Sequence, residues 1–324
     1  MNILPAIAAV LLSLSLCHGA DSPAPRKLRV ALPGSPSARY AGLYVAAEKK
    51  IYSARGLDVE FLNYPSPQKA GLALQKGEAD AAVLTFSQAM LMREGKEKTK
   101  PVLLAQEFPK SSLVLVGRKS DGINKPSDVE GRRVAIFEDM QAQPRAFFRK
   151  YDSNVTFVSQ PYSVNSFLRG AVAVASARRY DELYSLHAAG IRPGELTVFA
   201  FDEHGIRMPE DGLYAGEQLV TKDSATVCAF ADASMQGWEA AAASPEEAFR
   251  IVIKQLHEAR IPASHMRQKH MLGEVIRLLP PFGKDVKPGK LADGEYSSAA
   301  ALLTETGIIK LAPPYETFVS ECAR

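Results

Sequence analysis

The sequence predicts an α/β protein with two lobes, each a doubly wound sheet flanked by helices, joined by two hinge crossings. The first reason is a strand–helix–strand–helix–strand pattern over residues 28–84, which makes two consecutive βαβ units. The second is that the same alternation restarts at Arg133 and continues to Phe201. With 324 residues and 46% hydrophobic residues, the chain is long and apolar enough for two packed cores. Together these features predict a clamshell.

The first block is organised around one helix and the strand that follows it. Apolar residues at helical spacing run from Tyr40 to Ile51, Gly56 suits a left-handed helix end, and the next residues alternate as a strand does. A second helix ends at Gly77. We expect strands and helices alternately at Leu28–Leu32, Tyr40–Ile51, Leu57–Phe61, Gln68–Lys76 and Asp80–Leu84.

The segments after the first block fall into three groups. A short helix at Ala89–Arg93 precedes two apolar strands at Pro101–Gln106 and Ser112–Val116. The second block predicts strands at Arg133–Phe137, Val155–Val158, Ala171–Ala175 and Leu196–Phe201, with helices at Gln141–Tyr151, Val164–Arg169 and Ala177–Ala189. An extended segment at Leu213–Thr221 leads to helices starting at Ser224, Pro245, Ser264 and Tyr296.

These segments predict the lobe boundaries. Extended stretches near Ser111–Gly117 and Tyr214–Thr221 are the two expected hinge crossings, and the helical carboxyl-terminal third returns to the first lobe. We therefore assign 28–111 and 218–324 to lobe 1, and 112–217 to lobe 2. Residues 21–27 form a linker after the leader described next.

Residues 1–20 predict a secretory signal peptide. They contain no charged side chain and are apolar from Ile3 to Cys17, with small residues Gly19 and Ala20 at a plausible cleavage site. Lipid anchoring through Cys17 is the less favoured alternative, because Leu16 stands where a small residue is usual. No other segment has the length of a membrane helix. We expect a soluble, periplasmic mature protein.

Charge and cysteine content limit the possible functions. The net charge is +3, from 39 basic and 36 acidic residues, and the basic residues are scattered, so the sequence does not predict nucleic-acid binding. Removal of the leader would leave Cys228 and Cys322. An oxidising compartment permits them to pair, but we favour two separate thiols because they lie far apart in the sequence. No spacing of Cys and His predicts a metal site.

Several polar and aromatic residues follow the predicted strands of the first block. The loop Pro33–Ser37, with Ser35, is either a ligand-binding loop at the carboxyl end of a strand or an ordinary connection. Thr85 and Ser87 can cap the next helix, face a ligand, or do both. The aromatic side chains of Tyr40, Tyr44 and Phe86 are candidates for stacking on a planar ligand, and core packing is the alternative for each.

Short motifs in a fixed order resemble a known family. They are Gly56–Glu60, Gly77–Asp80, the stretch from Ile123 to Val134, Gly237–Glu239 and Ser244–Ala248. Together they resemble type II periplasmic solute-binding proteins of ABC importers. The resemblance is to the branch named after thiamine-pyrimidine precursor synthase, alongside sulfonate- and taurine-binding relatives, and it covers about residues 28–310.

The resemblance implies further site residues. In relatives that bind aminopyrimidines, a Glu after an Asn contacts the ligand's amino group; here the pair reads Asp181-Glu182. The alternative for Glu182 is a solvated ion pair with Arg178 on the same helix. His204 lies either in a cleft loop or in a plain loop. The family's acid after Gly170 is absent. The remaining candidate ligand-binding residues are Tyr64, Glu138, Tyr180 and Tyr214.

The expected function is binding rather than catalysis. We expect a monomeric substrate-binding protein, without cofactor, metal or catalytic residues, that delivers a small polar organic solute to an ABC permease in the inner membrane. A pyrimidine-like, amino-bearing or sulfonate-type solute fits, with an amino-bearing one favoured. The alternatives are a sensing module for a receptor kinase and an enzyme of thiamine-pyrimidine precursor biosynthesis. The enzyme of the resembled family has a Cys-rich iron site, and this chain has only three cysteines.

Overall fold

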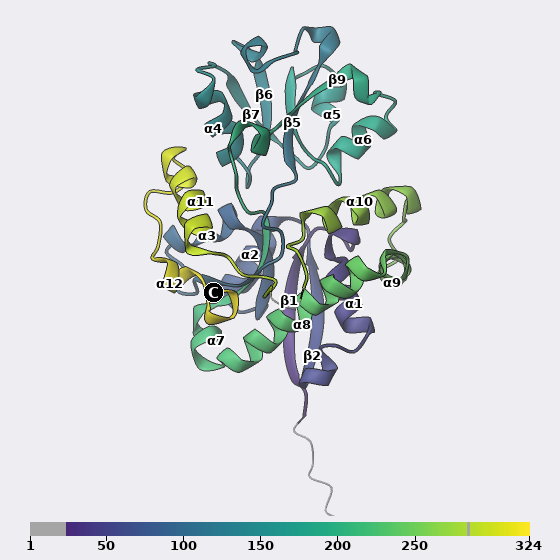
Figure 1. Ribbon diagram of the computed structural model, residues 1–324, viewed down its shortest axis with the longest axis vertical. Helices are drawn as coiled ribbons and strands as arrows, with labels where there is room; N and C mark the ends of the chain where they lie inside the picture. The colour runs from purple at the N-terminus through teal and green to yellow at the C-terminus, as the bar shows by residue number, and fades with distance from the viewer. Residues whose placement is uncertain (1–23, 284–285) are drawn as a thin grey trace, which may run out of the picture.

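Two five-stranded mixed sheets, one in each lobe, form the framework of the protein (Figure 1). The computed structural model describes residues 24–283 and 286–324. The first sheet has the order β2–β1–β3–β10–β4, and the second has the order β7–β6–β8–β5–β9. The strands of the first sheet are β1 (Arg26–Pro33), β2 (Leu57–Tyr64), β3 (Ala81–Thr85), β4 (Pro101–Gln106) and β10 (Asp211–Gly216). Those of the second are β5 (Leu113–Arg118), β6 (Arg133–Phe137), β7 (Thr156–Gln160), β8 (Val174–Arg178) and β9 (Leu196–Ala200).

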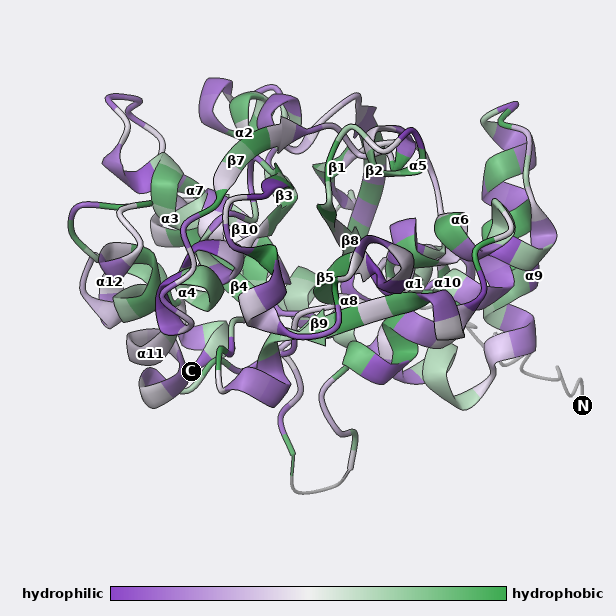
Figure 2. Ribbon diagram, turned by 90° about the horizontal axis from the view of Figure 1, so that it is seen from above, coloured by the Kyte–Doolittle hydropathy of each residue, from purple (hydrophilic) through white to green (hydrophobic). Residues whose placement is uncertain are grey.

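Helices cover both sheets, so the predicted two-lobed α/β fold is confirmed. The first lobe carries α1 (Ala41–Glu48), α2 (Pro67–Lys76), α3 (Phe86–Glu94) and the carboxyl-terminal helices α7 (Glu217–Lys222), α8 (Ser224–Ala243), α9 (Pro245–Glu258), α10 (His265–Leu278), α11 (Asp293–Glu305) and α12 (Tyr315–Phe318). The second carries α4 (Ala142–Lys150), α5 (Asn165–Leu168) and α6 (Glu182–Ala188). Along α9, hydrophobic and hydrophilic residues alternate (Figure 2), and the hydrophobic ones are buried against the first lobe.

The chain crosses between the lobes from β4 to β5 and returns from β9 to β10. Each crossing strand lies antiparallel to its neighbours in the sheet it enters. β10 falls within residues 112–217, which the sequence assigned to lobe 2, but it pairs with β3 and β4 of the first sheet. That boundary is corrected to the segment before Asp211. The extended segment predicted to reach Thr221 ends at Gly216, where α7 begins.

The third strand of the second block lies later in the chain than predicted. β8 runs from Val174 to Arg178, whereas a helix was expected from Ala177. Backbone pairing of Ala177 with Val114 and of Arg178 with Leu113 holds both residues in the sheet. This tertiary pairing outweighs the helical preference of Ala and Arg. The helix α6 therefore begins only at Glu182.

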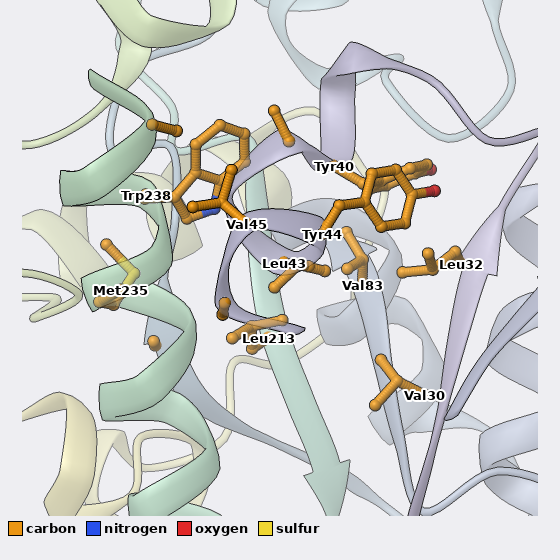
Figure 3. Packing of buried hydrophobic residues seen from close by; sticks show 14 of the residues in the cluster. Val30, Leu32, Tyr40, Leu43, Tyr44, Val45, Val83, Leu213, Met235 and Trp238 are labelled. Carbon is orange, nitrogen blue, oxygen red and sulfur yellow. The ribbon is translucent and has the colours of Figure 1, made fainter. Parts of the chain in front are cut away.

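Helix α8 packs closely against α1 (Figure 3). A Cβ atom on Gly42 would lie 2.2 Å from Cδ2 of Trp238, and one on Gly237 would lie 2.1 Å from the carbonyl oxygen of Gly42. The two glycines thus allow the helix backbones to approach. Trp238, the only tryptophan in the sequence, is fully buried at this contact.

Cys228 and Cys322 form a disulfide, which corrects the preference for two separate thiols. Their Cα atoms are 5.2 Å apart, although 94 residues separate them in sequence. α8 and the turn Glu321–Ala323 both lie beside β4, which brings the two cysteines together. Sequence distance therefore gave no sign of their spatial proximity.

The predicted signal peptide, residues 1–20 with Cys17, lies outside the described residues. Among the residues the structure describes, no helix combines the length and the hydropathy needed to cross a membrane.

Candidate functional site

A cleft of about 430 Å³ lies between the two lobes. The loop after β1, the turn Ala38–Tyr40 before α1, the start of α2, and α9–α10 contribute from the first lobe; residues at or just after the ends of β7 and β8 contribute from the second. The lining residues are Pro33, Gly34, Ser35, Pro36, Ser37, Arg39, Tyr40, Pro65, Pro67, Leu256, Ile261, Pro262, Arg267, Gln268 and Met271, with Tyr162, Arg178, Tyr180 and Asp181 across the cleft. Residues of both lobes would therefore contact one bound molecule at the same time.

Arg39 is the charged group of the first-lobe wall. Its Nε and Nη2 each donate to a carboxylate oxygen of Asp211 at 2.6 Å, and only 10% of its side chain is exposed. Burial lowers the pKa of Arg39, but the nearby Asp211 charge more than compensates and the pKa is raised well above its usual value. The guanidinium is thus a fixed, permanently charged donor.

Arg178 is the corresponding group of the second lobe. Its Nε donates to Oε2 of Glu182 at 2.9 Å and its Nη2 donates to Oε1 at 2.5 Å. Burial lowers the pKa of Arg178, yet the Glu182 charge raises it well above its usual value. The guanidinium also lies over the Tyr162 ring, with 4.7 Å between Cζ and the ring centroid, which is a cation–π contact.

Three tyrosines line the cleft in different ways. Tyr40 is buried and its hydroxyl donates to the carbonyl of Pro33; burial raises its pKa to about 12. The buried Tyr180 donates to Glu210 at 3.0 Å. Tyr162 is 41% exposed, although its hydroxyl donates to Asp139 at 2.5 Å and its ring stacks on Phe137 with 5.0 Å between centroids. Tyr162 is therefore the aromatic surface that the cleft leaves open.

Contacts from α10 join the lobes along one side of the cleft. Arg267 Nε donates to Oδ1 of Asp181 at 3.0 Å. His270 Nε2 lies 3.1 Å from the carbonyl oxygen of Arg179, and its ring lies 4.8 Å from that of Tyr184. His270 is thus partly buried between the lobes.

Glu210 links the two chain segments that cross between the lobes. Its carboxylate accepts hydrogen bonds from the backbone N and Oγ of Ser112, at 2.6 Å and 2.8 Å, and from Tyr180. Burial, followed by the charge of Asp211, raises its pKa. The carboxylate therefore joins the outgoing crossing, the returning crossing and the second lobe.

Of the residues predicted to bind ligand, three line this cleft: Ser35, Tyr40 and Tyr180. Several others lie in the protein core. Tyr44 packs edge-on against Phe61, and Phe86 packs against Phe318; Tyr214 is fully buried. Tyr44 and Phe86 thus follow the core alternative that the sequence left open, and Tyr214, predicted to bind ligand, is a core residue instead.

The polar candidates are bound within the protein or lie away from the cleft. Thr85 accepts from the backbone N of Gln88 and so caps α3, while the Ser87 hydroxyl contacts Sδ of Met208 at 3.2 Å. Tyr64 is half-buried and Glu138 is exposed, and neither lines the cleft. His204 lies beyond it in the second lobe, where its Nδ1 is 2.6 Å from the Tyr151 hydroxyl.

Glu182 requires a correction. It is not part of a solvated ion pair on one helix, because Arg178 ends β8 and the exposed fractions of the two side chains are 4% and 7%. It also does not line the cleft. Its oxygens accept from the N, Nε and Nη2 atoms of Arg178, so Glu182 positions that guanidinium.

The sequence analysis missed Arg39, Asp211, Tyr162, Arg178 and Arg267. A strand prediction that continued through Ala177 would have placed Arg178 at a strand's carboxyl end, where ligands bind in such sheets. Asp211 gave no comparable signal, since its partner Arg39 is 172 residues away in sequence.

Two further features bear on the choice of site. A larger hollow of about 740 Å³ is lined by Val102, Glu217, Arg324 and neighbours, all from the first lobe. It therefore does not lie between the lobes. Within residues 24–283 and 286–324, no group of three or more His, Cys, Asp and Glu side chains is placed to hold a metal ion.

Comparisons with known proteins agree with this architecture. The model of a family described as NMT1/THI5 like matches residues 37–248. The riboflavin-binding protein RibY of Chloroflexus aurantiacus is 23% identical over 299 residues, which cover 87% of this chain and 83% of that protein. The aliphatic sulphonate-binding protein SsuA of Escherichia coli has a similar fold, with a TM-score of 0.69 at 14% identity, covering 92% of each chain. A ligand-binding component of an ABC-type import system from Staphylococcus aureus has a TM-score of 0.67 at 12% identity, covering 91% of this chain and 96% of that one.

Proposed function

Because this chain belongs to the NMT1/THI5-like family, we propose that it is the substrate-binding component of an ABC importer, exported to the periplasm. It captures a small organic solute in the interlobe cleft and delivers it to a permease in the inner membrane. Similar folds in the SsuA and Staphylococcus aureus import proteins support a role in binding rather than catalysis.

One observation carries the proposal: the cleft is lined from both lobes, and within residues 24–283 and 286–324 two chain segments cross between them. A ligand that touches Tyr40 and Tyr162 together stabilises the closed arrangement over the open one. The energy of binding is thereby converted into a change of shape that a permease can recognise. No step of this cycle requires a bond to be made or broken.

The test begins with protein purified from its native host. Native mass spectrometry is expected to find one noncovalently bound small molecule per chain. After removal of that solute, small-angle X-ray scattering should show a larger radius of gyration, which decreases when the solute is added back. Reconstitution with a permease encoded beside this chain should give solute-dependent ATP hydrolysis.

Three outcomes would contradict the proposal. A pyridoxal species covalently held on a lysine would favour the biosynthetic enzyme. An unchanged radius of gyration with every copurified solute would exclude ligand-driven closure. Activation of a receptor kinase, with no effect on a permease, would favour the sensing module instead.

A further inference from the structure

We propose that the solute is a planar, singly charged anion: an aromatic ring bearing one carboxylate or sulfonate group. Its oxygen atoms lie between Arg39 of the first lobe and Arg178 of the second, and its ring lies against Tyr162. This inference rests on the proposed binding function and specifies the chemistry of the same cleft.

The two arginines face the cleft with unused donors. Each holds a carboxylate through its Nε and Nη2 atoms, so the Nη1 side of each guanidinium points elsewhere. Within the described residues, Nη1 of Arg39 makes no hydrogen bond, and Nη1 of Arg178 makes one of 3.3 Å to the Tyr180 hydroxyl. A guanidinium fixed in this way offers an anionic oxygen a charge-assisted hydrogen bond.

The charges of the lining favour an anion over a cation. Three arginines line the cleft and Asp181 is the one acid among them. The positive charges of Arg39 and Arg178 repel each other. The Arg39 charge accordingly lowers the pKa of Arg178, whereas the Glu182 charge raises it. An anion placed between the two arginines, which belong to opposite lobes, removes this repulsion at the moment of closure.

The counter-charges behind the arginines disfavour a ligand with more than one negative charge. Asp211 and Glu182 already neutralise the two guanidinium groups, and both carboxylates are buried. Among the described residues, the carboxylates at the cleft are already paired with arginines, which disfavours the amino-bearing ligand that the sequence favoured. Glu182 is saturated by Arg178, and Asp181 is held by Arg178 and Arg267.

Tyr162 supports the aromatic part of the inference. Its ring is 41% exposed in a cleft whose other tyrosines are buried, and Asp139 and Phe137 fix its orientation. A preoriented, open aromatic face suits a stacked ring at small entropic cost. The volume of about 430 Å³ accommodates a molecule of one or two rings.

The test is isothermal titration calorimetry on the full mature chain, stripped of solute by unfolding and refolding. The probes are benzoate, benzenesulfonate, benzamide as a neutral isostere, benzylamine as a cation, and propanesulfonate as a non-aromatic anion. We expect at least one aromatic anion to bind ten-fold or more tightly than each of the other three. Tyr162→Ala should weaken that binding at least five-fold, and Tyr162→Phe should preserve it; circular dichroism verifies that both variants fold.

The inference is overturned if benzamide, benzylamine or propanesulfonate equals the aromatic anions, if neither anion binds at 10 mM, or if Tyr162→Ala binds like wild type. Scattering with the solute from native protein separates this failure from that of the proposed function. If a neutral or cationic native solute closes the lobes, the binding function stands and this inference falls. If no solute closes them, both fall.

Discussion

Arg267 in α10 and Asp181 before α6 form an ion pair that joins the two lobes, with 3.0 Å between Nε and Oδ1. The Arg267 side chain is 44% exposed, so the pair contributes at most about 1 kcal/mol. We predict that Arg267→Met shifts the ligand-free protein toward the open form by about two- to five-fold. Interlobe fluorescence energy transfer measures the shift.

The matched control for this change is Lys269→Met in the same helix. Lys269 pairs with Glu246 at 2.7 Å, and both residues belong to the first lobe. This variant should leave the distribution between the lobes unchanged. Equal transfer efficiencies for both variants and wild type would show that the Arg267–Asp181 pair does not hold the lobes together.

The Arg178–Glu182 pair permits a second prediction, on stability. Replacing Glu182 by Gln leaves the buried guanidinium with only the longer 3.3 Å contact to Asp181 as counter-charge, which we expect to cost about 3 kcal/mol. Glu195→Gln is the control, because Glu195 also pairs with an arginine of the second lobe but is 48% exposed. It should leave the stability close to that of wild type. Urea unfolding compares the two, and similar losses would contradict the burial argument.

The order of strands and helices could be predicted from the sequence, because the spacing of apolar residues differs between a strand and a helix. Leu28–Leu32 and Asp80–Leu84 are apolar runs, and β1 and β3 occupy these positions. Strand pairing was less accessible. Nothing local distinguishes Asp211–Gly216, which returns to the first sheet, from a strand of the second, because its partners are more than 100 residues away.

The site was predictable only where it follows a strand directly. Ser35 and Tyr40 come soon after β1, and Tyr180 soon after β8. Arg39 and Asp211 depend on a contact between distant segments that leaves no local pattern. Tyr44 and Phe86 were predicted to bind ligand but are buried in the core. An aromatic residue on a helix near a strand end can face either the core or the cleft, and the local sequence does not distinguish the two.

A third prediction concerns the disulfide. In a chain-entropy model, closing a loop with a sequence separation of 94 stabilises the fold by about 4.7 kcal/mol. The double variant Cys228→Ser/Cys322→Ser should lose stability of that order in urea. Wild type with dithiothreitol should fall to the level of the variant, and the reductant should not affect the variant. If reduction leaves the wild-type midpoint unchanged, the bond contributes no stability.

The contact between α1 and α8 gives a fourth prediction. Gly42→Ala would place a methyl group 2.2 Å from Cδ2 of Trp238, so the helices must move apart at a cost of about 1–3 kcal/mol. Gly273→Ala in α10 is the control, because nothing lies within 4 Å of the added carbon. It should stabilise the helix by about 0.5–1 kcal/mol. Thermal unfolding measures the midpoint Tm of both variants. A lower Tm for Gly42→Ala and a higher Tm for Gly273→Ala would confirm the close approach of the helices; equal shifts would contradict it.

The fifth prediction concerns Glu107, which lies just after β4 and is buried. It accepts a hydrogen bond of 2.6 Å from Nε1 of Trp238. Burial raises the pKa of Glu107 from 4.5 to about 8, and the hydrogen bond from Trp238 opposes this only in part. The folded protein therefore retains a proton that the unfolded chain releases near pH 4.5.

Between pH 4.5 and about 8 the unfolded state binds fewer protons at Glu107 than the folded state, so stability falls as pH rises. The contribution is about 1.4 kcal/mol per pH unit. In Glu107→Gln the amide oxygen can still accept a hydrogen bond from Trp238, but the side chain does not titrate. We therefore expect the unfolding free energy of this variant to fall less steeply between pH 5 and 8 than that of wild type, by up to about 1.4 kcal/mol per pH unit. Urea unfolding at four pH values measures the slope, with Glu97→Gln at an exposed position as the control that keeps the wild-type slope. A Glu107→Gln slope equal to wild type would mean that the carboxyl is already ionised in the folded protein.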